Sequence, residues 1–195
     1  MICRKCDEES VDIASSYLKR GKVVVIPTDT VYGFSAIVDG RHYSYHTDEK
    51  IRAIKGRDEK KSFIQLISSP ADLKKYTRDL VPEEILSKWP GSLTIIVHTF
   101  EKSDEISTTA FRCPDDPWLR SVIAKCGAPI YSTSLNRSGE PILDNVQDIK
   151  REFGNEVDLI IDDGSKRGNV PSTIVAIEED GSVTLVRKGA VEINL

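Results

Sequence analysis

The stretch Lys22–Gly33, which reads KVVVIPTDTVYG, restricts the fold of this chain more than any other. Its apolar, β-branched residues up to Ile26 are typical of a buried strand. We expect that strand to end at Pro27, because proline lacks a backbone N–H and has a fixed φ. Three residues with side-chain oxygens follow, Thr28–Thr30. Because ligands of open α/β sheets lie beyond strand ends, the stretch predicts either a binding loop or a solvated turn.

The composition is that of an ordinary globular protein. Of the 195 residues, 30% are charged and 39% are hydrophobic, which predicts one domain over residues 1–195. With a net charge of −4, the chain needs a local basic patch to bind nucleic acid. No apolar run is long enough for a membrane span, and the N-terminus lacks the apolar core of a secretory signal. We therefore expect a cytoplasmic protein without a membrane partner.

The four cysteines do not predict a metal centre. Cys3 and Cys6 form a CxxC pair, whereas Cys113 and Cys126 lie far apart in the sequence. A zinc site would favour a second close pair, and the three histidines show no ligand spacing. We expect no metal ligands, and we interpret the thiols as reduced and without a role.

Hydrophobic periodicity, caps and turn residues predict helices and strands that interleave irregularly. The expected helices cover residues 10–20, 47–56, 82–89, 116–127 and 144–153, with one more starting at Ser69–Pro70. The expected strands cover residues 22–26, 34–38, 63–67, 93–97, 129–133, 157–161, 173–177 and 183–187. We interpret residues 101–109 as a surface loop. The predicted fold class is α/β, of the α+β type, with a mixed sheet.

A short basic segment, Lys55–Arg57, is the first candidate for a binding site. If the segment is extended, the side chains of Lys55 and Arg57 point the same way, and Gly56 lets the backbone approach a ligand. An ammonium and a guanidinium together suit a triphosphate. The alternative is a solvated charge run at the end of a helix.

Small polar side chains form the second candidate site. In an extended segment, Ser132, Ser134 and Asn136 share one face, and their hydroxyl and amide groups suit phosphate, ribose or an amino acid. The alternative is a turn rich in Asn, Ser and Gly. Ser172 and Arg187 are further candidates of the same kind, since they place a hydroxyl group and a cation at strand ends.

Arg112, between apolar neighbours, is expected to be partly buried. It then requires an anion, which either a ligand carboxylate or a structural salt bridge supplies. No phosphate-binding loop, HExxH or GxSxG motif occurs in the sequence. Without a clear nucleophile or proton shuttle, the polar set suits phosphoryl or nucleotidyl transfer, in which positioning and charge dominate.

From about Val11 to Val191, these stretches resemble the YrdC/Sua5 family of threonylcarbamoyl-AMP synthases. The matching motifs occur in the order of the family: Pro27–Gly33 resembles PTETVYG with Asp29 in place of Glu, Lys55–Arg57 resembles KxR, Trp89–Thr94 resembles WPGPLT, Ser134–Asn136 matches SxN, Pro171–Val175 resembles ESTVV, and Val186–Ala190 resembles LRPGA. The resemblance implies a YrdC-like twisted mixed sheet flanked by helices.

The resemblance also implies a reaction and its residues. The reaction is formation of L-threonylcarbamoyl-adenylate and pyrophosphate from L-threonine, bicarbonate and ATP, with Mg²⁺. Other proteins then transfer the threonylcarbamoyl group to tRNA for the t6A modification. The residues implied for threonine are Thr30, Arg112 (on the carboxylate), Ser132 and Ser172. Those implied for the nucleotide are Lys55, Arg57, Ser134, Asn136 and Arg187, with Lys55 and Arg57 also catalytic.

The segment after Lys55–Arg57 departs from the family pattern. Asp58, Lys61–Ser62 and Leu66 replace a usual Pro, Asn-Pro and His. This departure leaves open an alternative function, that of a YciO-like paralogue that binds double-stranded RNA or a nucleotide and has little synthase activity.

Overall fold

In the computed structural model of the protein, residues 1–40, 43–56, 62–99, 107–166 and 168–193 are described. The helices of this part are α1 (Ser10–Lys19), α2 (Thr47–Lys55), the 3₁₀ helix η1 (Pro70–Lys75), α3 (Glu83–Leu86), α4 (Pro117–Cys126) and α5 (Val146–Phe153). The strands are β1 (Ile2–Arg4), β2 (Val24–Pro27), β3 (Tyr32–Ile37), β4 (Ile64–Leu66), β5 (Leu93–Thr99), β6 (Ser107–Arg112), β7 (Ile130–Ser134), β8 (Leu159–Asp162), β9 (Thr173–Ile177) and β10 (Val183–Arg187).

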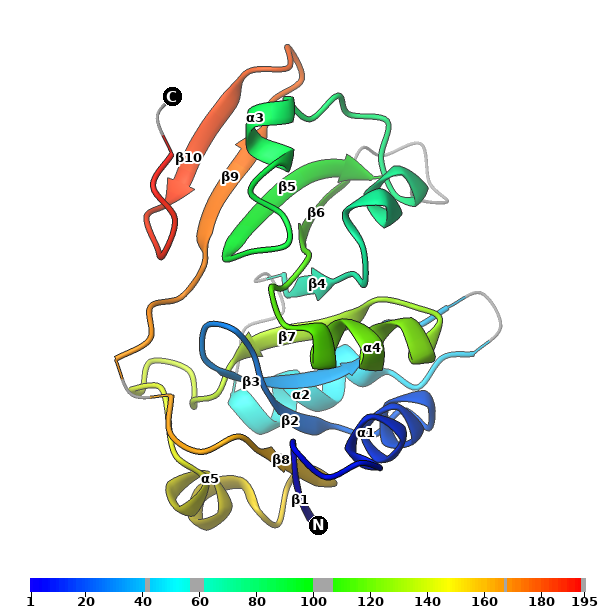
Figure 1. The fold of residues 1–195 in the computed structure, drawn as a ribbon, viewed down its shortest axis with the longest axis vertical. Helices are drawn as coiled ribbons and strands as arrows, with labels where there is room; N and C mark the ends of the chain where they lie inside the picture. Colours follow the sequence, from blue (N-terminus) through cyan, green and yellow to red (C-terminus); the bar gives the residue numbers. More distant parts are fainter. Residues whose placement is uncertain (41–42, 57–61, 100–106, 167, 194–195) are drawn as a thin grey trace.

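The strands form one twisted sheet along the long axis of the molecule, in the order β1-β8-β2-β3-β7-β4-β6-β5-β9-β10 (Figure 1). We call β1 to β7 in this order the first half of the sheet, and β4 to β10 the second half. The sheet contains parallel pairs such as β2–β8 and β5–β9 and antiparallel pairs such as β2–β3 and β5–β6. The mixed sheet flanked by helices confirms the predicted fold class.

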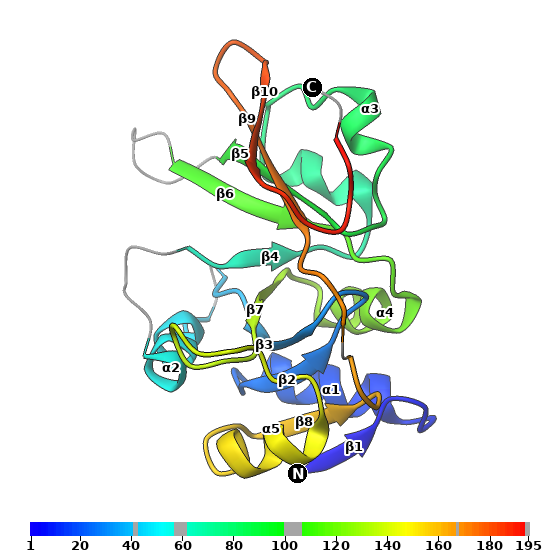
Figure 2. The same cartoon turned by 90° about the vertical axis from the view of Figure 1, so that its left-hand side faces the viewer.

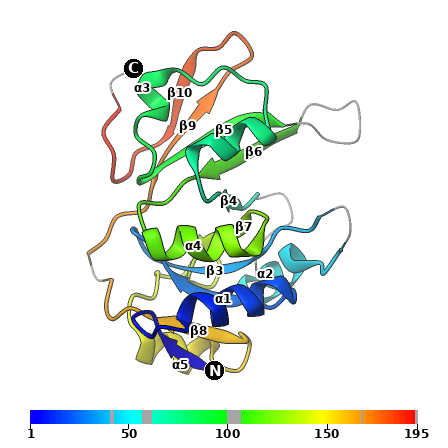
Figure 3. The same ribbon diagram turned by 45° about the vertical axis from the view of Figure 1, so that its right-hand side comes forward.

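Helices cover both faces of the first half. Helices α1 and α4 lie side by side on one face (Figure 3), where Leu18 and Leu119 pack against Val24. Helices α2 and α5 cover the other face, where Ile51 and Phe153 belong to one apolar cluster. Alternate side chains of a strand point to opposite faces, so burial on both faces requires the continuous β-branched run of β2.

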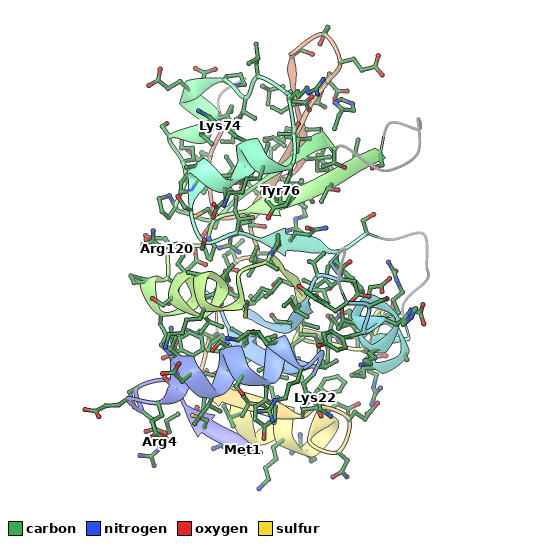
Figure 4. The ribbon with its side chains drawn as sticks, turned by 90° about the vertical axis from the view of Figure 1, so that its right-hand side faces the viewer. Met1, Arg4, Lys22, Lys74, Tyr76 and Arg120 are labelled. Carbon is green, nitrogen blue, oxygen red and sulfur yellow. The ribbon has the colours of Figure 1, made fainter. Side chains whose placement is uncertain are left out.

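The second half has helical cover on one face. Elements η1 and α3 pack there against Leu93, Ile95 and Phe111. In Figure 4, Lys74 and Tyr76 mark this half, whereas Met1, Arg4 and Lys22 mark the half that carries α1. The opposite face carries Ile96 and Ile174, which face the cavity described below.

The connection from β8 to β9, residues 163–172, runs from one half of the sheet to the other (Figure 2). Apart from residue 167, which is not described, it is fixed against the β2–β3 hairpin. The Tyr32 hydroxyl donates to Gly164 O at 2.8 Å and accepts from Asp163 N at 2.9 Å. Asn169 Nδ2 donates to Thr30 O at 2.6 Å. The hairpin turn is thereby held at the boundary between the halves.

The elements differ from the sequence prediction in a few places. Part of the loop expected at 101–109 is strand β6, because Ser107–Phe111 pair with β5 on one side and Ala110–Arg112 pair with β4 on the other. The helix after Ser69 is a 3₁₀ helix, and β1 was not predicted. In the described part of the chain, no helix has the length and apolarity needed to cross a membrane.

Candidate active site

A cavity of about 320 Å³ lies between the two halves of the sheet. The β2–β3 hairpin and β7 line it from the first half, and β6, β9 and β10 line it from the second. The sequence-predicted site residues in its wall are Thr30, Arg112, Ser132, Ser134, Ser172 and Arg187. They come from distant segments of the chain, and the fold brings them to one place.

Arg112 is buried at the base of this cavity, with 4% of its surface exposed. Nη2 forms an ion pair with Asp29 Oδ1 at 2.6 Å, Nη1 donates to Thr30 Oγ1 at 2.9 Å, and Nε donates to Gly91 O at 3.0 Å. Burial lowers the pKa of Arg112, and the charge of Asp29 opposes that effect. The structural salt bridge left open by the sequence is therefore present. One N–H of Nη1 has no partner among the described residues.

The turn that carries Thr30 is fixed by its own threonines. Thr28 Oγ1 accepts from the backbone N–H groups of Thr30 at 3.1 Å and Val31 at 3.2 Å. The two hydroxyls, of Thr28 and Thr30, lie 2.9 Å apart. Such local side-chain bonds to the backbone stabilise a turn. Thr28 and Thr30 are buried and line the cavity, so the solvated turn that the sequence offered as an alternative does not describe them.

Arg187 and Ser172 also line the cavity. Arg187 Nη2 donates to Ser172 O at 2.7 Å, and Ser172 Oγ lies 2.8 Å from Thr94 Oγ1. Burial lowers the pKa of Arg187. In contrast to Arg112, Arg187 has no carboxylate partner within the described ranges. The two guanidinium groups therefore leave one uncompensated positive charge, which is an attractive position for an anion.

Lys55 and Asn136 lie outside the cavity wall, next to Ser134. The Lys55 side chain is 3% exposed, and its Nζ donates to Ser134 O at 2.5 Å, Asn136 O at 2.8 Å and Asn136 Oδ1 at 3.0 Å. The assumption of an extended segment at Lys55 is wrong, because Lys55 ends α2 and Gly56 has a φ of +61°. Arg57 lies outside the described residues, and so do Asp58 and Lys61.

The described residues of the departing segment differ in their relation to the cavity. Ser62 and Ile64 line the wall. Leu66 is buried in the apolar cluster beneath α1 and α4. The family's histidine position is therefore occupied here by a core residue.

Sequence reasoning missed two partners in this site. It identified Asp29 as an oxygen-bearing residue and did not assign it to Arg112. It also did not single out Thr94, although a polar residue inside the apolar run LTIIV is a signal that one face of the strand is not core.

The residues of the cavity wall do not form a metal site. The wall contains no carboxylate within the described part of the chain, and no metal-ligating group of three such side chains is found there. Mg²⁺ prefers carboxylate, phosphate and water oxygens. The Mg²⁺ that the resemblance implies would therefore be held by the phosphates of a bound nucleotide and not by this wall.

A family model described as telomere recombination, which covers Sua5, YciO and YrdC proteins, matches residues 16–189. The chain belongs to the Sua5/YciO/YrdC family. This family membership confirms the resemblance drawn from the motifs, since the match spans all six of them apart from the last residue, Ala190.

A threonylcarbamoyl-AMP synthase from Bacillus subtilis is 32% identical over 192 residues, which are 91% of this chain and 53% of the relative. A crystal structure of Pyrococcus abyssi Sua5 complexed with L-threonine has a TM-score of 0.81 and 29% identity, covering 97% of this chain and 57% of that one. Escherichia coli YciO has a TM-score of 0.80 and 22% identity, over 98% and 95% of the chains, and shows the fold alone. The chain spans about half the length of the curated relatives from P. abyssi and B. subtilis.

Proposed function

We propose that the protein is a threonylcarbamoyl-AMP synthase, a nucleotidyltransferase that forms L-threonylcarbamoyl-adenylate and pyrophosphate from L-threonine, bicarbonate and ATP. The product would then supply other proteins that transfer the threonylcarbamoyl group to tRNA. The names of the relatives support this class of reaction. The observation that carries the proposal is the convergence of six sequence-predicted site residues, four of them from the family motifs, on one cavity between the halves of the sheet.

The chemistry of the wall suits such a reaction. Threonine and bicarbonate combine with loss of water to a carbamate, an oxygen of which must bond to the α-phosphorus of ATP as pyrophosphate leaves. The substrates supply the nucleophile, so the protein needs to position two anions and stabilise charge. All four residues proposed for threonine line the cavity, and one of them, Ser172, lies next to Arg187. The uncompensated charge of Arg187 lies on the side proposed for phosphate.

Arg112 would act through the one N–H that its partners leave over. A threonine carboxylate that accepts this N–H and a hydroxyl of the wall would gain charge-assisted hydrogen bonds in a buried position. Because Asp29 already balances Arg112, the carboxylate would not meet a full positive charge there. Discrimination for threonine would then rest on the hydroxyl groups and the apolar side chains of the wall, such as Ile96 and Ile174.

The test is a mass-spectrometric assay for threonylcarbamoyl-adenylate with purified protein, ATP, Mg²⁺, bicarbonate and threonine. Product that depends on both threonine and bicarbonate is the expected result. Serine in place of threonine is the specificity control. The variant Arg187→Met should lower turnover on the order of 10²-fold, as for loss of a group that stabilises transition-state charge. Absence of product from a folded protein that binds ATP would overturn the proposal.

One observation favours a second function, that of a YciO-like module that binds RNA or a nucleotide with little synthesis. Lys55 donates to the Ser134–Asn136 segment and is not among the residues that line the cavity. If the protein is such a module, Lys55→Ala would lower the affinity for double-stranded RNA and make that affinity less dependent on salt. Neither the wild type nor the variant would then turn over ATP. Under the synthase reading, Lys55→Ala would reduce a measurable turnover.

A further inference from the structure

Arg137 follows the SxN segment, and its guanidinium group binds two helices that do not line the cavity. Nη1 donates to Ile54 O of α2 at 2.6 Å. Nε pairs with Glu152 at 3.0 Å, and Nη2 pairs with Glu156 at 2.5 Å, the first on α5 and the second just beyond it. The guanidinium carbon lies 4.8 Å from the centre of the Phe153 ring. Arg137 therefore links the loop after β7 to both helices on this face of the sheet.

The same loop is held on its other side by the end of α2. Ser138 N donates to Lys55 O at 2.8 Å, and Lys55 Nζ binds the Ser134–Asn136 segment as described above. Asn136 Nδ2 closes the loop on itself through Arg137 O at 2.9 Å and Glu140 O at 2.7 Å. The conformation of Asn136 thus depends on contacts made by its neighbour in the chain.

We propose that Arg137 is a positioning residue for the nucleotide side of the site. Its bonds to Ile54, Glu152 and Glu156 hold residues 134–140 against Lys55, and so fix the Ser134 hydroxyl and the Asn136 amide. The bond to Ile54 O also satisfies one of the last carbonyls of α2, which lack partners within the helix. This inference rests on the proposed function for its effect on ATP, and on the contacts alone for its effect on the loop.

The effect of Arg137 on the loop can be measured separately from its effect on the free energy of unfolding. The Arg137 side chain is 36% exposed, and exposed ion pairs contribute little to the free energy of unfolding. The planar guanidinium group of Arg137 binds several fixed acceptors, and it therefore restricts the backbone of the loop after β7. Loss of Arg137 should therefore loosen the loop and leave the fold intact.

Hydrogen–deuterium exchange tests the effect on the loop. The variants are Arg137→Gln and, as a control, Arg151→Gln, which makes the same charge change on α5. Arg151 is 77% exposed and pairs with Asp148 within that helix. We expect faster exchange of peptides containing the amides of Ser138 and Leu143 in Arg137→Gln alone. Equal exchange in the wild type and Arg137→Gln would overturn the proposal.

Steady-state kinetics test the effect on the nucleotide. Arg137→Gln should raise the KM for ATP by about tenfold, with kcat and the KM for threonine within about twofold of the wild type. A rise in the KM for ATP alone, with the KM for threonine and the urea midpoint of unfolding unchanged, is the result that a merely structural role would not produce. Equal changes in both KM values, or an effect of Arg151→Gln of the same size, would overturn the proposal.

If the wild type yields no threonylcarbamoyl-adenylate, the proposed function fails by that measurement alone. Calorimetric ATP affinity then replaces KM for the same variants. A loss of about tenfold in Arg137→Gln would still support the positioning role, and unchanged affinity would contradict it.

Discussion

Arg112 illustrates how a single buried charge determines what its surroundings can do. A guanidinium group with almost no exposed surface must be balanced, and Asp29 supplies the balance at 2.6 Å. Asp29 is itself fixed by the backbone N–H of Asp115 at 3.1 Å. These bonds join the β2–β3 turn to the end of β6, so the pair contributes to the structure of the cavity as well as to its charge.

Replacement of Asp29 by Asn should be strongly destabilising, because it leaves the Arg112 charge buried without a counter-charge. We expect the free energy of unfolding to fall by about 3–5 kcal/mol, as for other broken buried pairs. Chemical denaturation of both proteins measures it. The control is Asp12→Asn, since the Asp12–Lys125 pair is exposed and should contribute less than about 1 kcal/mol. Equal losses in the two variants would contradict the prediction.

The cysteines should differ widely in reactivity toward alkylating agents. Burial raises the pKa of both Cys113 and Cys126 to about 11, whereas Cys6 is exposed. A thiol of pKa 11 is thiolate only on the order of 10⁻³ of the time at pH 8. With iodoacetamide at pH 8, peptide mass spectrometry should therefore detect modification of Cys6 first. Modification of Cys113 at the rate of Cys6 in the folded protein would contradict the assigned burial.

At the scale of helices and strands, the local sequence was sufficient to predict an element where its buried residues follow the period of a helix or form a continuous apolar run. The Gly-terminated helices α2 and α4 and the β-branched strand β2 were predicted because propensity, capping and periodicity agree there. Strands β1 and β6 were not predicted, because their short or hydroxyl-rich sequences become strands only by pairing with distant neighbours.

For the candidate site, the sequence indicated residues more readily than their geometry. Sequence reasoning named six of the residues that line the cavity, and it also named Lys55 and Asn136, which lie outside the wall. The spacing of the basic residues suggested an extended Lys55, whereas the helix continues through it and the left-handed Gly56 ends it. The sequence left open whether a ligand carboxylate or a structural salt bridge balances Arg112. The answer depends on a contact between Asp29 and Arg112, which are 83 residues apart, and no local pattern contains that information.

The segment that connects β8 to β9 predicts a specific dependence on pH. Burial alone would raise the pKa of Asp163, but hydrogen bonds from Lys166 and Lys5 lower it below the ordinary value. A carboxyl group whose pKa is lower in the folded state stabilises the fold at pH values above its pKa in the unfolded state, which is about 3.9. This stabilisation is lost as the pH falls through the folded-state pKa.

The difference in unfolding free energy between the wild type and Asp163→Asn should therefore be constant from pH 7 to about 5, and should shrink below about pH 4. Urea denaturation at several pH values measures it. A difference that grows on acidification would show that the Lys5 and Lys166 contacts do not stabilise the carboxylate.

For the whole molecule, the decisive question is how firmly the halves of the sheet are joined. The junction between β7 and β4 consists of the residue pairs Ser132–Ile64, Tyr131–Gln65 and Ile130–Leu66. The Arg112–Asp29 pair and the connecting segment 163–172 add to this short junction. Because the cavity lies at the junction, its shape depends on both halves remaining together.

The two tryptophans of the chain test whether the halves unfold as one domain. Trp89 is buried in the cluster of the second half, and Trp118 lies on α4 in the first half. In Trp89→Phe the fluorescence reports on the first half, and in Trp118→Phe it reports on the second. If the sheet is one cooperative unit, the fluorescence midpoint in urea will coincide with the far-ultraviolet circular dichroism midpoint in each variant. If the Trp89 signal is lost at a lower urea concentration than the dichroism, the second half unfolds separately, and residues 1–195 contain two folding units joined at the cavity.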